Sequence, residues 1–141
     1  MRHIVYLSLG ANIGDKENTI RNAIKMLGES VGDVTGVSSM IETEPWGFES
    51  ENSFMNCAVR VETGYTPTEV LKRTQEIESA LGRTHKTTNG EYKDRLIDID
   101  ILLYDDITVN LPELRIPHPL MHDRDFVMTP LREIYHKPGG N

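Results

Sequence analysis

Two aspartates stand one residue apart inside an otherwise apolar run, Leu96-Ile97-Asp98-Ile99-Asp100-Ile101-Leu102-Leu103. In an extended strand alternate side chains point to opposite faces, so the isoleucines would be buried and both aspartates would share the other face. At ~3.3 Å per residue their carboxylates would stand roughly 6–7 Å apart. Carboxylates fixed so close repel each other, and a divalent cation such as Mg²⁺ removes the repulsion. The pair indicates a magnesium site, although an exposed pair that only solubilises the strand would have the same pattern.

The segment just before this strand is basic. Four cationic side chains stand against two carboxylates, a local charge of +2 with His85 neutral: Arg83, Lys86, Lys93 and Arg95 against Glu91 and Asp94. A metal-bound polyphosphate needs this combination, because carboxylates hold the metal while guanidinium groups bind the remaining phosphate oxygens. Together with the aspartate pair, the segment favours a polyphosphate site over a solvated surface loop.

His118 lies between two prolines, Pro117 and Pro119. Prolines on both sides restrict the backbone, so we expect the imidazole to be held in one orientation. A held imidazole can act as a ligand or donate a hydrogen bond to phosphate. A single histidine in a proline-rich loop is, however, more often structural than catalytic.

Phe54 and Asn56 fall on one face of a predicted strand, and Phe126 follows later in the chain. Two aromatic rings could sandwich a flat heterocycle while the amide, which is both donor and acceptor, binds its edge. Either phenylalanine could instead belong to the core.

Other familiar chemistry is not indicated. The segment from Gly10 to Gly14 lacks the spacing of a phosphate-binding loop and is interpreted as a strand-to-helix turn. Ser8 and Ser38 have no accompanying His and Asp set, and Cys57 falls on the core face of its strand, so nucleophilic catalysis is not expected.

Periodicity and the positions of Gly and Pro predict the elements that must position these residues. The predicted strands are Ile4–Leu9, Val34–Ile41, Phe54–Thr63 and Leu96–Tyr104, with a short extended piece over Ile107–Val109. One helix is predicted to begin at the N-cap Asp15 and to end in a left-handed cap at Gly28 or Gly32. A second begins with the capping box Thr66-Pro67-Thr68-Glu69 and ends at Gly82, and a third spans Phe126–Tyr135.

This order predicts an α+β, ferredoxin-like β-α-β-β-α-β sandwich, with helices packed on one face of an antiparallel sheet. In the first helix Ile20, Ala23, Ile24 and Leu27 should face the core. In the second the inward residues are Val70, Leu71, Thr74, Ile77 and Leu81.

Composition excludes several classes of function. The chain has 141 residues and a net charge of −7, so a single domain over 1–141 is expected and a broad nucleic-acid surface is not. Since residues 83–95 carry +2, the rest carries −9, which favours one local site for a polyphosphate. With Cys57 as the single cysteine and no long apolar run, we expect a cytoplasmic protein without a disulfide or membrane span.

Taken together, these motifs resemble the 6-hydroxymethyl-7,8-dihydropterin pyrophosphokinase family. The similarity runs in order over nearly the whole chain, through Leu9-Gly10-Ala11-Asn12-Ile13-Gly14-Asp15, Glu42-Thr43-Glu44-Pro45-Trp46-Gly47, Phe54-Met55-Asn56-Cys57-Ala58-Val59, Gln75-Glu76-Ile77-Glu78, Gly82-Arg83, Arg95-Leu96-Ile97-Asp98-Ile99-Asp100-Ile101-Leu102, Ile116-Pro117-His118-Pro119 and Arg124-Asp125-Phe126-Val127. The run containing Asp98 and Asp100 and the Pro-His-Pro motif are its most specific parts.

The resemblance implies an ATP-dependent diphosphotransferase of folate biosynthesis that moves a pyrophosphoryl group from ATP to the pterin's hydroxymethyl group and leaves AMP. It implies two Mg²⁺ ions on Asp98 and Asp100, which would position the hydroxyl for in-line attack on the β-phosphorus. The implied catalytic residues are Arg83, Arg95, Asp98, Asp100 and His118. The implied ATP-binding residues are Gln75, Glu78, Arg83, His85, Lys86, Tyr92, Arg95, Ile101, His118 and Arg124. The implied pterin-binding residues are Thr43, Glu44, Pro45, Trp46, Phe54, Asn56, Asp98 and Phe126.

This chain departs from the family pattern at two positions. Relatives often carry an aromatic-Gly-Pro-Arg run where it has Tyr92-Lys93-Asp94-Arg95, so Tyr92 would take the stacking role. His85 stands where many relatives place a second arginine, which leaves some of the phosphate charge to Lys86.

Two other classes stay open on sequence grounds. One is another two-metal phosphoryl or nucleotidyl transferase on a ferredoxin-like fold, and the other is a non-catalytic module that binds a small ligand. The other transferase would bind a polymer or transfer a nucleotide, and the net charge of −7 disfavours a nucleic-acid substrate. For this chain we expect ATP and a pterin as small-molecule partners, no nucleic acid, no membrane, and a monomer.

Overall fold

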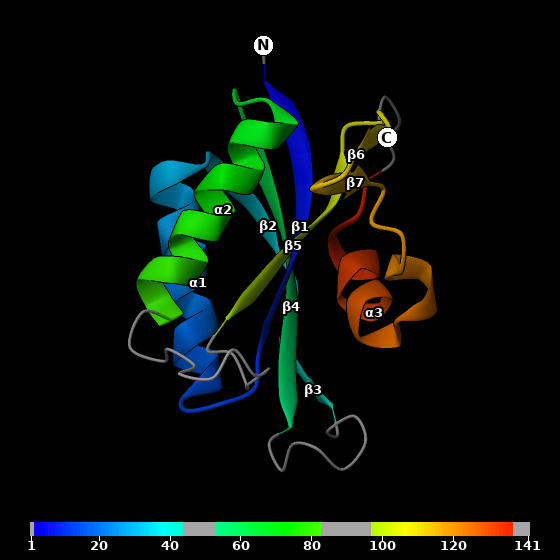
Figure 1. Ribbon diagram of the computed structural model, residues 1–141. Helices are drawn as coiled ribbons and strands as arrows, with labels where there is room; N and C mark the ends of the chain where they lie inside the picture. The colour runs from blue at the N-terminus through cyan, green and yellow to red at the C-terminus, as the bar shows by residue number, and fades with distance from the viewer. Residues whose placement is uncertain (1, 44–52, 83–96, 137–141) are drawn as a thin grey trace.

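A five-stranded antiparallel sheet carries the fold in the computed structural model, which describes residues 2–43, 53–82 and 97–136 (Figure 1). The main path across the sheet is β2-β4-β1-β5, and β3 pairs with the end of β4. The strands are β1 (His3–Ala11), β2 (Asp33–Val37), β3 (Ile41–Thr43), β4 (Phe54–Thr63) and β5 (Asp98–Tyr104). This strand order, with helical crossovers, confirms the predicted ferredoxin-like α+β fold.

Helices cover both faces of the sheet. The two long helices, α1 (Lys16–Ser30) and α2 (Pro67–Gly82), share one face as predicted, while α3 (Asp125–Ile134) lies on the other (Figure 1). The larger core cluster joins Ile20, Ala23, Leu27, Val70 and Ile77 of the long helices to Cys57, Val59 and Val61 of β4. A second cluster joins Val127, Leu131 and Ile134 of α3 to Tyr6, Ala58 and Leu102. None of the helices in the described ranges is long and apolar enough to cross a membrane.

The predicted starts of both long helices are confirmed. The side chain of Asp15 accepts a 3.2 Å hydrogen bond from the N–H of Asn18. The hydroxyl of Thr66 accepts one from the N–H of Glu69 at 3.3 Å, whereas the Glu69 carboxylate pairs with Arg73 at 3.0 Å. Side-chain caps satisfy N–H groups that have no partner inside the helix, which fixes where each helix begins.

The predicted glycine cap of α1 is wrong. The helix continues through Gly28 to Ser30, and Gly32 is not left-handed, since Gly14 is the glycine with positive φ (68°) in the described residues. Gly32 is required for a different reason. A Cβ at this position would stand 2.0 Å from the carbonyl oxygen of Glu62 on β4. The glycine therefore allows the chain to pass against the sheet.

The predicted strand Val34–Ile41 is divided into β2 and β3. The interruption falls at Ser38, whose hydroxyl accepts a 2.8 Å hydrogen bond from the N–H of Ala58. The side chain thus takes the place of a backbone carbonyl in the ladder with β4. The periodicity of the sequence does not indicate that a side-chain oxygen replaces a backbone carbonyl here.

The extended piece predicted over Ile107–Val109 is shifted and forms part of a hairpin. β6 (Val109–Leu111) pairs with β7 (Leu114–Ile116), a strand that the sequence pattern does not indicate. Leu114 and Ile116 are buried, and this packing holds the hairpin beside β5. A short 3-10 turn (Met121–Asp123) then leads into α3.

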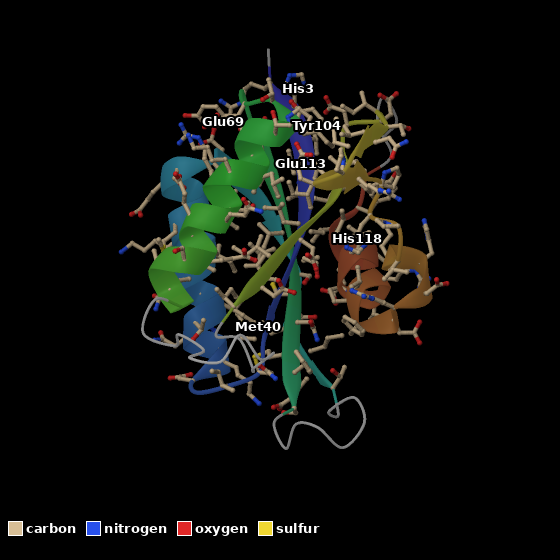
Figure 2. All side chains as sticks on the ribbon, in the orientation of Figure 1. His3, Met40, Glu69, Tyr104, Glu113 and His118 are labelled. Atoms are coloured by element: carbon tan, nitrogen blue, oxygen red, sulfur yellow. The ribbon has the colours of Figure 1, made fainter. Side chains whose placement is uncertain are left out.

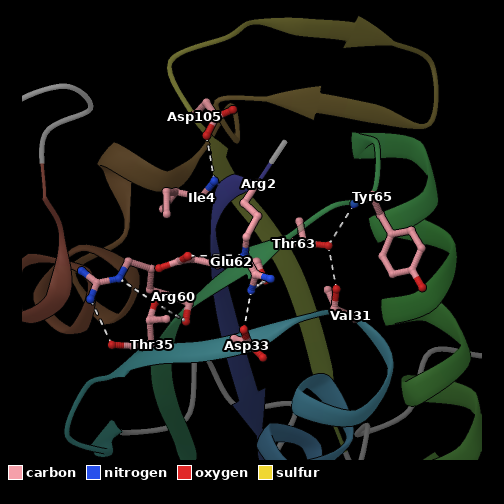
Figure 3. A network of polar contacts seen from close by, with 10 residues as sticks. All are labelled: Arg2, Ile4, Val31, Asp33, Thr35, Arg60, Glu62, Thr63, Tyr65 and Asp105. Atoms are coloured by element: carbon pink, nitrogen blue, oxygen red, sulfur yellow. Dashed lines mark hydrogen bonds and ion pairs between the residues drawn. The ribbon is translucent and has the colours of Figure 1, made fainter.

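A network of polar contacts fastens the end of the sheet where β1 begins (Figure 3). Thr63 of β4 donates to the carbonyl oxygen of Val31 at 2.6 Å and accepts from the N–H of Tyr65 at 3.1 Å. The carboxylate of Asp105 accepts from the N–H of Ile4 at 2.7 Å. These contacts join the end of α1 and the turn before α2 to the sheet.

Candidate active site

A cavity of about 520 Å³ lies on the face of the sheet that α3 covers. It is lined by Ser8, Gly10, Phe54, Asn56, Asp98, Asp100, Leu120, Asp123, Arg124, Phe126 and Val127. Strand register explains how residues so far apart in sequence meet. Gly10 of β1 stands opposite Asn56 on one side and Asp98 on the other, and Ser8 stands opposite Asp100. Residues directly opposite in neighbouring strands point to the same face, so these side chains form rows across three strands.

Asp98 and Asp100 share this face as predicted. Between and beside them Ile97, Ile99 and Ile101 are buried on the other side of β5, at 3%, 5% and 4% exposure. Asp98 is exposed and Asp100 is half-buried. The described ranges contain no group of three or more His, Cys, Asp or Glu side chains that could hold a metal ion by themselves. A cation here would take its remaining ligands from water or substrate.

Asn56 has an unsatisfied donor. The residue is 4% exposed, and its Nδ2 is the one buried side-chain nitrogen or oxygen in the described part of the chain without a hydrogen-bond partner. Such a group costs about 1–3 kcal/mol when it is left unpaired. An unpaired donor in the wall of a cavity indicates that a ligand supplies the acceptor.

Gly10 leaves room beside this amide. A Cβ at Gly10 would stand 3.0 Å from Oδ1 of Asn56, tighter than ordinary van der Waals contact. Sequence analysis interpreted Gly10 as part of a turn, but β1 continues to Ala11 and includes it. A glycine inside a strand is a known sign of close approach by another group, and this signal could have identified the position.

The two predicted stacking residues, Phe54 and Phe126, both line the cavity and are half-buried. Arg124 lies against Phe126, with its guanidinium carbon 5.7 Å from the ring centroid. Thr43 pairs with Phe54 at the end of β4. Phe54, Asn56, Asp98 and Phe126 of the predicted pterin set thus line one cavity, whereas Thr43 does not line it. Glu44, Pro45 and Trp46 lie outside the described residues.

His118 lies on the α3 side of the sheet (Figure 2) and lines a second cavity of about 250 Å³ along β5. Asp100 lines both cavities, so they adjoin at this residue. The N–H of Leu120 donates to Nδ1 of His118 at 3.2 Å, which leaves the proton of a neutral imidazole on Nε2. Burial lowers the pKa of His118, the charge of Arg124 lowers it further, and Asp98 opposes both effects. The lowered pKa favours the neutral imidazole, in which Nε2–H is the hydrogen-bond donor.

The other predicted ATP-binding residues divide into three groups. Ile101 lines the second cavity. Glu78 contacts β5, because its Oε2 accepts a 2.7 Å hydrogen bond from the N–H of Ile99. Gln75 is exposed on α2 and lines neither cavity. The remaining residues lie outside the described ranges: Arg83, His85, Lys86, Tyr92 and Arg95.

Besides Gly10, sequence reasoning missed four cavity residues. Ser8 is the register partner of Asp100, which only the strand pairing reveals. Leu120, Asp123 and Val127 reach the cavity through the turn before α3 and the start of that helix, and no local pattern marks them.

Comparisons with known proteins identify the family of this chain. The family described as 7,8-dihydro-6-hydroxymethylpterin-pyrophosphokinase (HPPK) matches residues 6–136. A 2-amino-4-hydroxy-6-hydroxymethyldihydropteridine pyrophosphokinase of Porphyromonas gingivalis is 48% identical over 132 residues, 93% of this chain and 90% of that protein. The protein of the same name from Bacillus subtilis is 43% identical over 135 residues, 95% of this chain and 79% of that protein.

Solved structures agree on the fold. The wild-type Plasmodium falciparum HPPK-DHPS chain superposes with a TM-score of 0.77 at 16% identity. The match covers 97% of this chain and 42% of that one, so this chain spans about two fifths of its length. The other transferase class and the non-catalytic module are not favoured by these matches. The chain belongs to the 7,8-dihydro-6-hydroxymethylpterin-pyrophosphokinase family and, as its sequence predicts, is a pyrophosphokinase of folate biosynthesis.

Proposed function

We propose that the pyrophosphokinase reaction takes place where the two cavities meet, with the pterin in the larger cavity and the ATP phosphates beside His118. The family uses ATP as co-substrate, and the reaction moves an intact pyrophosphoryl group to the hydroxymethyl group of 6-hydroxymethyl-7,8-dihydropterin, which leaves AMP. Asp100, which lines both cavities, would then stand where donor and acceptor meet.

The single observation that carries this assignment is the unpaired, buried Nδ2 of Asn56 in the wall of the larger cavity. A pterin ring offers acceptors along its edge, and one of them would satisfy this donor. Phe54 and Phe126 would stack on the two faces of the ring. A bound ring held in this way has its hydroxymethyl group oriented before the reaction begins, which lowers the entropic part of the barrier.

His118 and Arg124 are proposed to bind the triphosphate. Because Nδ1 of His118 already accepts from the N–H of Leu120, Nε2–H is the group that can donate a hydrogen bond to a phosphate oxygen. Arg124 adds a permanent positive charge at the wall of the larger cavity. Both groups would stabilise negative charge on the phosphate oxygens as the pyrophosphoryl group is transferred. Arg83 and Arg95 are proposed to do the same.

Asp98 and Asp100 are proposed to hold Mg²⁺, and two ions are expected. Two carboxylates on one face of a strand suit this ion, which binds proteins through one or two carboxylates and takes its other ligands from water and phosphate. When bound, Mg²⁺ neutralises phosphate charge and makes the substrate hydroxyl more acidic. The aspartates themselves fix the cation beside the cavity.

We also propose that one domain over residues 1–141 carries the activity as a monomer in the cytoplasm. The single cysteine, Cys57, is buried, which suits a reducing compartment. Analytical ultracentrifugation of the active protein tests the monomer.

The test of the proposed function is product analysis. Purified protein with Mg²⁺, ATP and the pterin should release AMP, and omission of the pterin should abolish the release. Asp98→Asn and Asp100→Asn should each lower kcat at least a hundredfold while the far-UV circular dichroism spectrum is unchanged. Asp106→Asn, in an exposed turn, is the matched control. Release of ADP, or turnover without the pterin, would contradict the assignment.

A further inference from the structure

Lys16, the first residue of α1, makes three hydrogen bonds at the end of the sheet where β3 meets β4. Its Nζ donates to Oε2 of Glu42 at 2.8 Å, to the hydroxyl of Ser53 at 2.8 Å and to the carbonyl oxygen of Ser53 at 3.2 Å. The hydroxyl of Ser53 donates in turn to the same Glu42 oxygen. An ammonium group has three protons, and each has an acceptor in this Lys16–Glu42–Ser53 cluster.

The cluster is more than a surface ion pair. The side chain of Lys16 is only 19% exposed, although that of Glu42 is 52% exposed. The hydrogen bond from Lys16 has the largest effect on the pKa of Glu42 and lowers it. The hydrogen bond from the Ser53 hydroxyl and the positive charge of Lys16 lower this pKa further. The carboxylate therefore remains ionised and the lysine keeps its partner at neutral pH.

Lys16 stands where helix energetics disfavours a cation. The N-terminus of a helix carries a partial positive charge, which stabilises acidic residues and destabilises lysine in the first turn. Docking of α1 does not depend on this lysine, because Asp15 caps the helix and Ile20, Ala23 and Leu27 are fully buried in the core. A residue that breaks a local preference without serving the fold points to a functional role.

The hydrogen bond from Lys16 to the Ser53 carbonyl lies next to the candidate site. That oxygen belongs to the peptide bond that precedes Phe54, the aromatic wall of the larger cavity, and Asn56 follows two residues later. Glu42 pairs with Met55 across the ladder. Lys16 itself does not line the cavity among the described residues, yet it holds the backbone on which Phe54 and Asn56 are placed.

We propose that Lys16 is a positioning residue for the pterin site: through Glu42 and the Ser53 peptide it fixes the backbone that carries Phe54 and Asn56. This inference rests on the proposed function, since it takes the larger cavity to be the pterin site. Lys16 touches neither substrate, so its effect falls on pterin affinity, while ATP affinity and the chemical step depend on other residues.

The test compares three variants with the wild type in direct pterin binding by calorimetry and in steady-state kinetics. Lys16→Met should weaken pterin binding and raise the pterin KM about tenfold, with the ATP KM and kcat changed less than twofold. Lys16→Arg, which keeps the charge and several donors, should restore most of the affinity. Lys25→Met, an exposed lysine on the same helix, should behave as wild type.

Several outcomes would overturn the inference. They are unchanged pterin affinity in Lys16→Met, an equal rise in the KM for ATP, or no rescue by arginine. If Lys16→Met does not fold, Ser53→Ala replaces it, because this variant removes the hydroxyl link and should raise the pterin Kd about threefold. Absence of pterin binding or AMP release in the wild type would instead contradict the proposed function itself.

Discussion

The carboxylate of Glu78 on α2 accepts a 2.7 Å hydrogen bond from the backbone N–H of Ile99, the residue between Asp98 and Asp100. Ile99 lies on β5, the last strand on the main path of the sheet. An edge strand presents N–H groups that the ladder does not use, and Glu78 satisfies one of them. The same bond fixes the backbone that sets the separation of the two aspartates.

Replacement of Glu78 should therefore affect both stability and catalysis. Glu78→Ala should lower the free energy of unfolding by about 1–3 kcal/mol and kcat by about tenfold, because the N–H of Ile99 loses its acceptor and the aspartates can shift. Glu78→Gln keeps an acceptor oxygen and should retain most of the wild-type stability and most of the wild-type kcat. Urea unfolding and steady-state kinetics measure the two effects, with Glu76→Ala as the exposed control on the same helix. Equal losses in the Gln and Ala variants would show that Glu78 acts through its charge.

Removal of the Asn56 side chain should weaken pterin binding strongly and change the stability of the fold only slightly. In Asn56→Ala the pterin Kd should rise about a hundredfold or more, because a site built around a buried hydrogen bond discriminates strongly. The free energy of unfolding should change by less than about 1 kcal/mol, since the variant also removes an unsatisfied buried donor. Calorimetric titration with the pterin and urea unfolding give the two values.

Asn22→Ala, at an exposed position of α1, is the control for this variant. If Asn56→Ala bound the pterin as tightly as the wild type, the proposal that the pterin binds in the larger cavity would be contradicted.

His118 should make the protein less stable in mild acid. Its pKa in the folded state is lowered, first by burial and then by Arg124, so the unfolded chain binds the proton more readily. The stabilisation from neutral His118 is thus complete above the ordinary histidine pKa and is lost as the pH falls below it.

The measurement is urea unfolding at pH 7.5 and pH 5.5. His118→Asn, which can keep an acceptor for the N–H of Leu120, should lose less stability between the two values than the wild type. Titration of the imidazole by NMR checks the direction independently, and a folded-state pKa above the ordinary histidine value would contradict the prediction.

The sequence was most informative where short-range rules decide the structure. Alternation placed Asp98 and Asp100 on one face, and capping chemistry placed the starts of α1 and α2 at Asp15 and Thr66. Prediction from the sequence failed where the structure depends on a contact with a distant backbone group. At Ser38 a side chain replaces a carbonyl of the strand ladder, and at Gly32 the chain passes against the backbone of Glu62. Neither contact leaves a periodic signal.

The site shows the same division. No local rule brings Phe54, Asn56, Asp100, His118 and Phe126 together. Residue chemistry suggested a joint role for Phe54, Asn56 and Phe126, and the family resemblance added Asp100 and His118. Strand register and the position of α3 account for the cavity physically. The cluster around Lys16 escaped prediction because Lys16, Glu42 and Ser53 are ordinary polar residues in three separate segments: the start of α1, β3 and the residue before β4. The predictions for Glu44, Pro45, Trp46 and residues 83–95 remain predictions.

The last prediction concerns the opposite end of the sheet, where Thr63 is 1% exposed (Figure 3). Its hydroxyl satisfies the carbonyl of Val31, one of the groups left without a partner at the end of α1, and also accepts from the N–H of Tyr65. Thr63→Val keeps the shape and removes the hydroxyl, so a buried carbonyl and a part-buried N–H lose their partner. The free energy of unfolding should fall by about 1–3 kcal/mol in urea titrations.

Thr108→Val, in an exposed segment, is the matched control and should change stability by less than about 0.5 kcal/mol. Both variants should keep wild-type KM values for ATP and the pterin, because the network lies at the end of β4 remote from Phe54. A Thr63→Val protein as stable as wild type would mean that water replaces the hydroxyl at no cost. A changed pterin KM would mean that the two ends of β4 are coupled, and the strand would then transmit strain from the α1 terminus to the site.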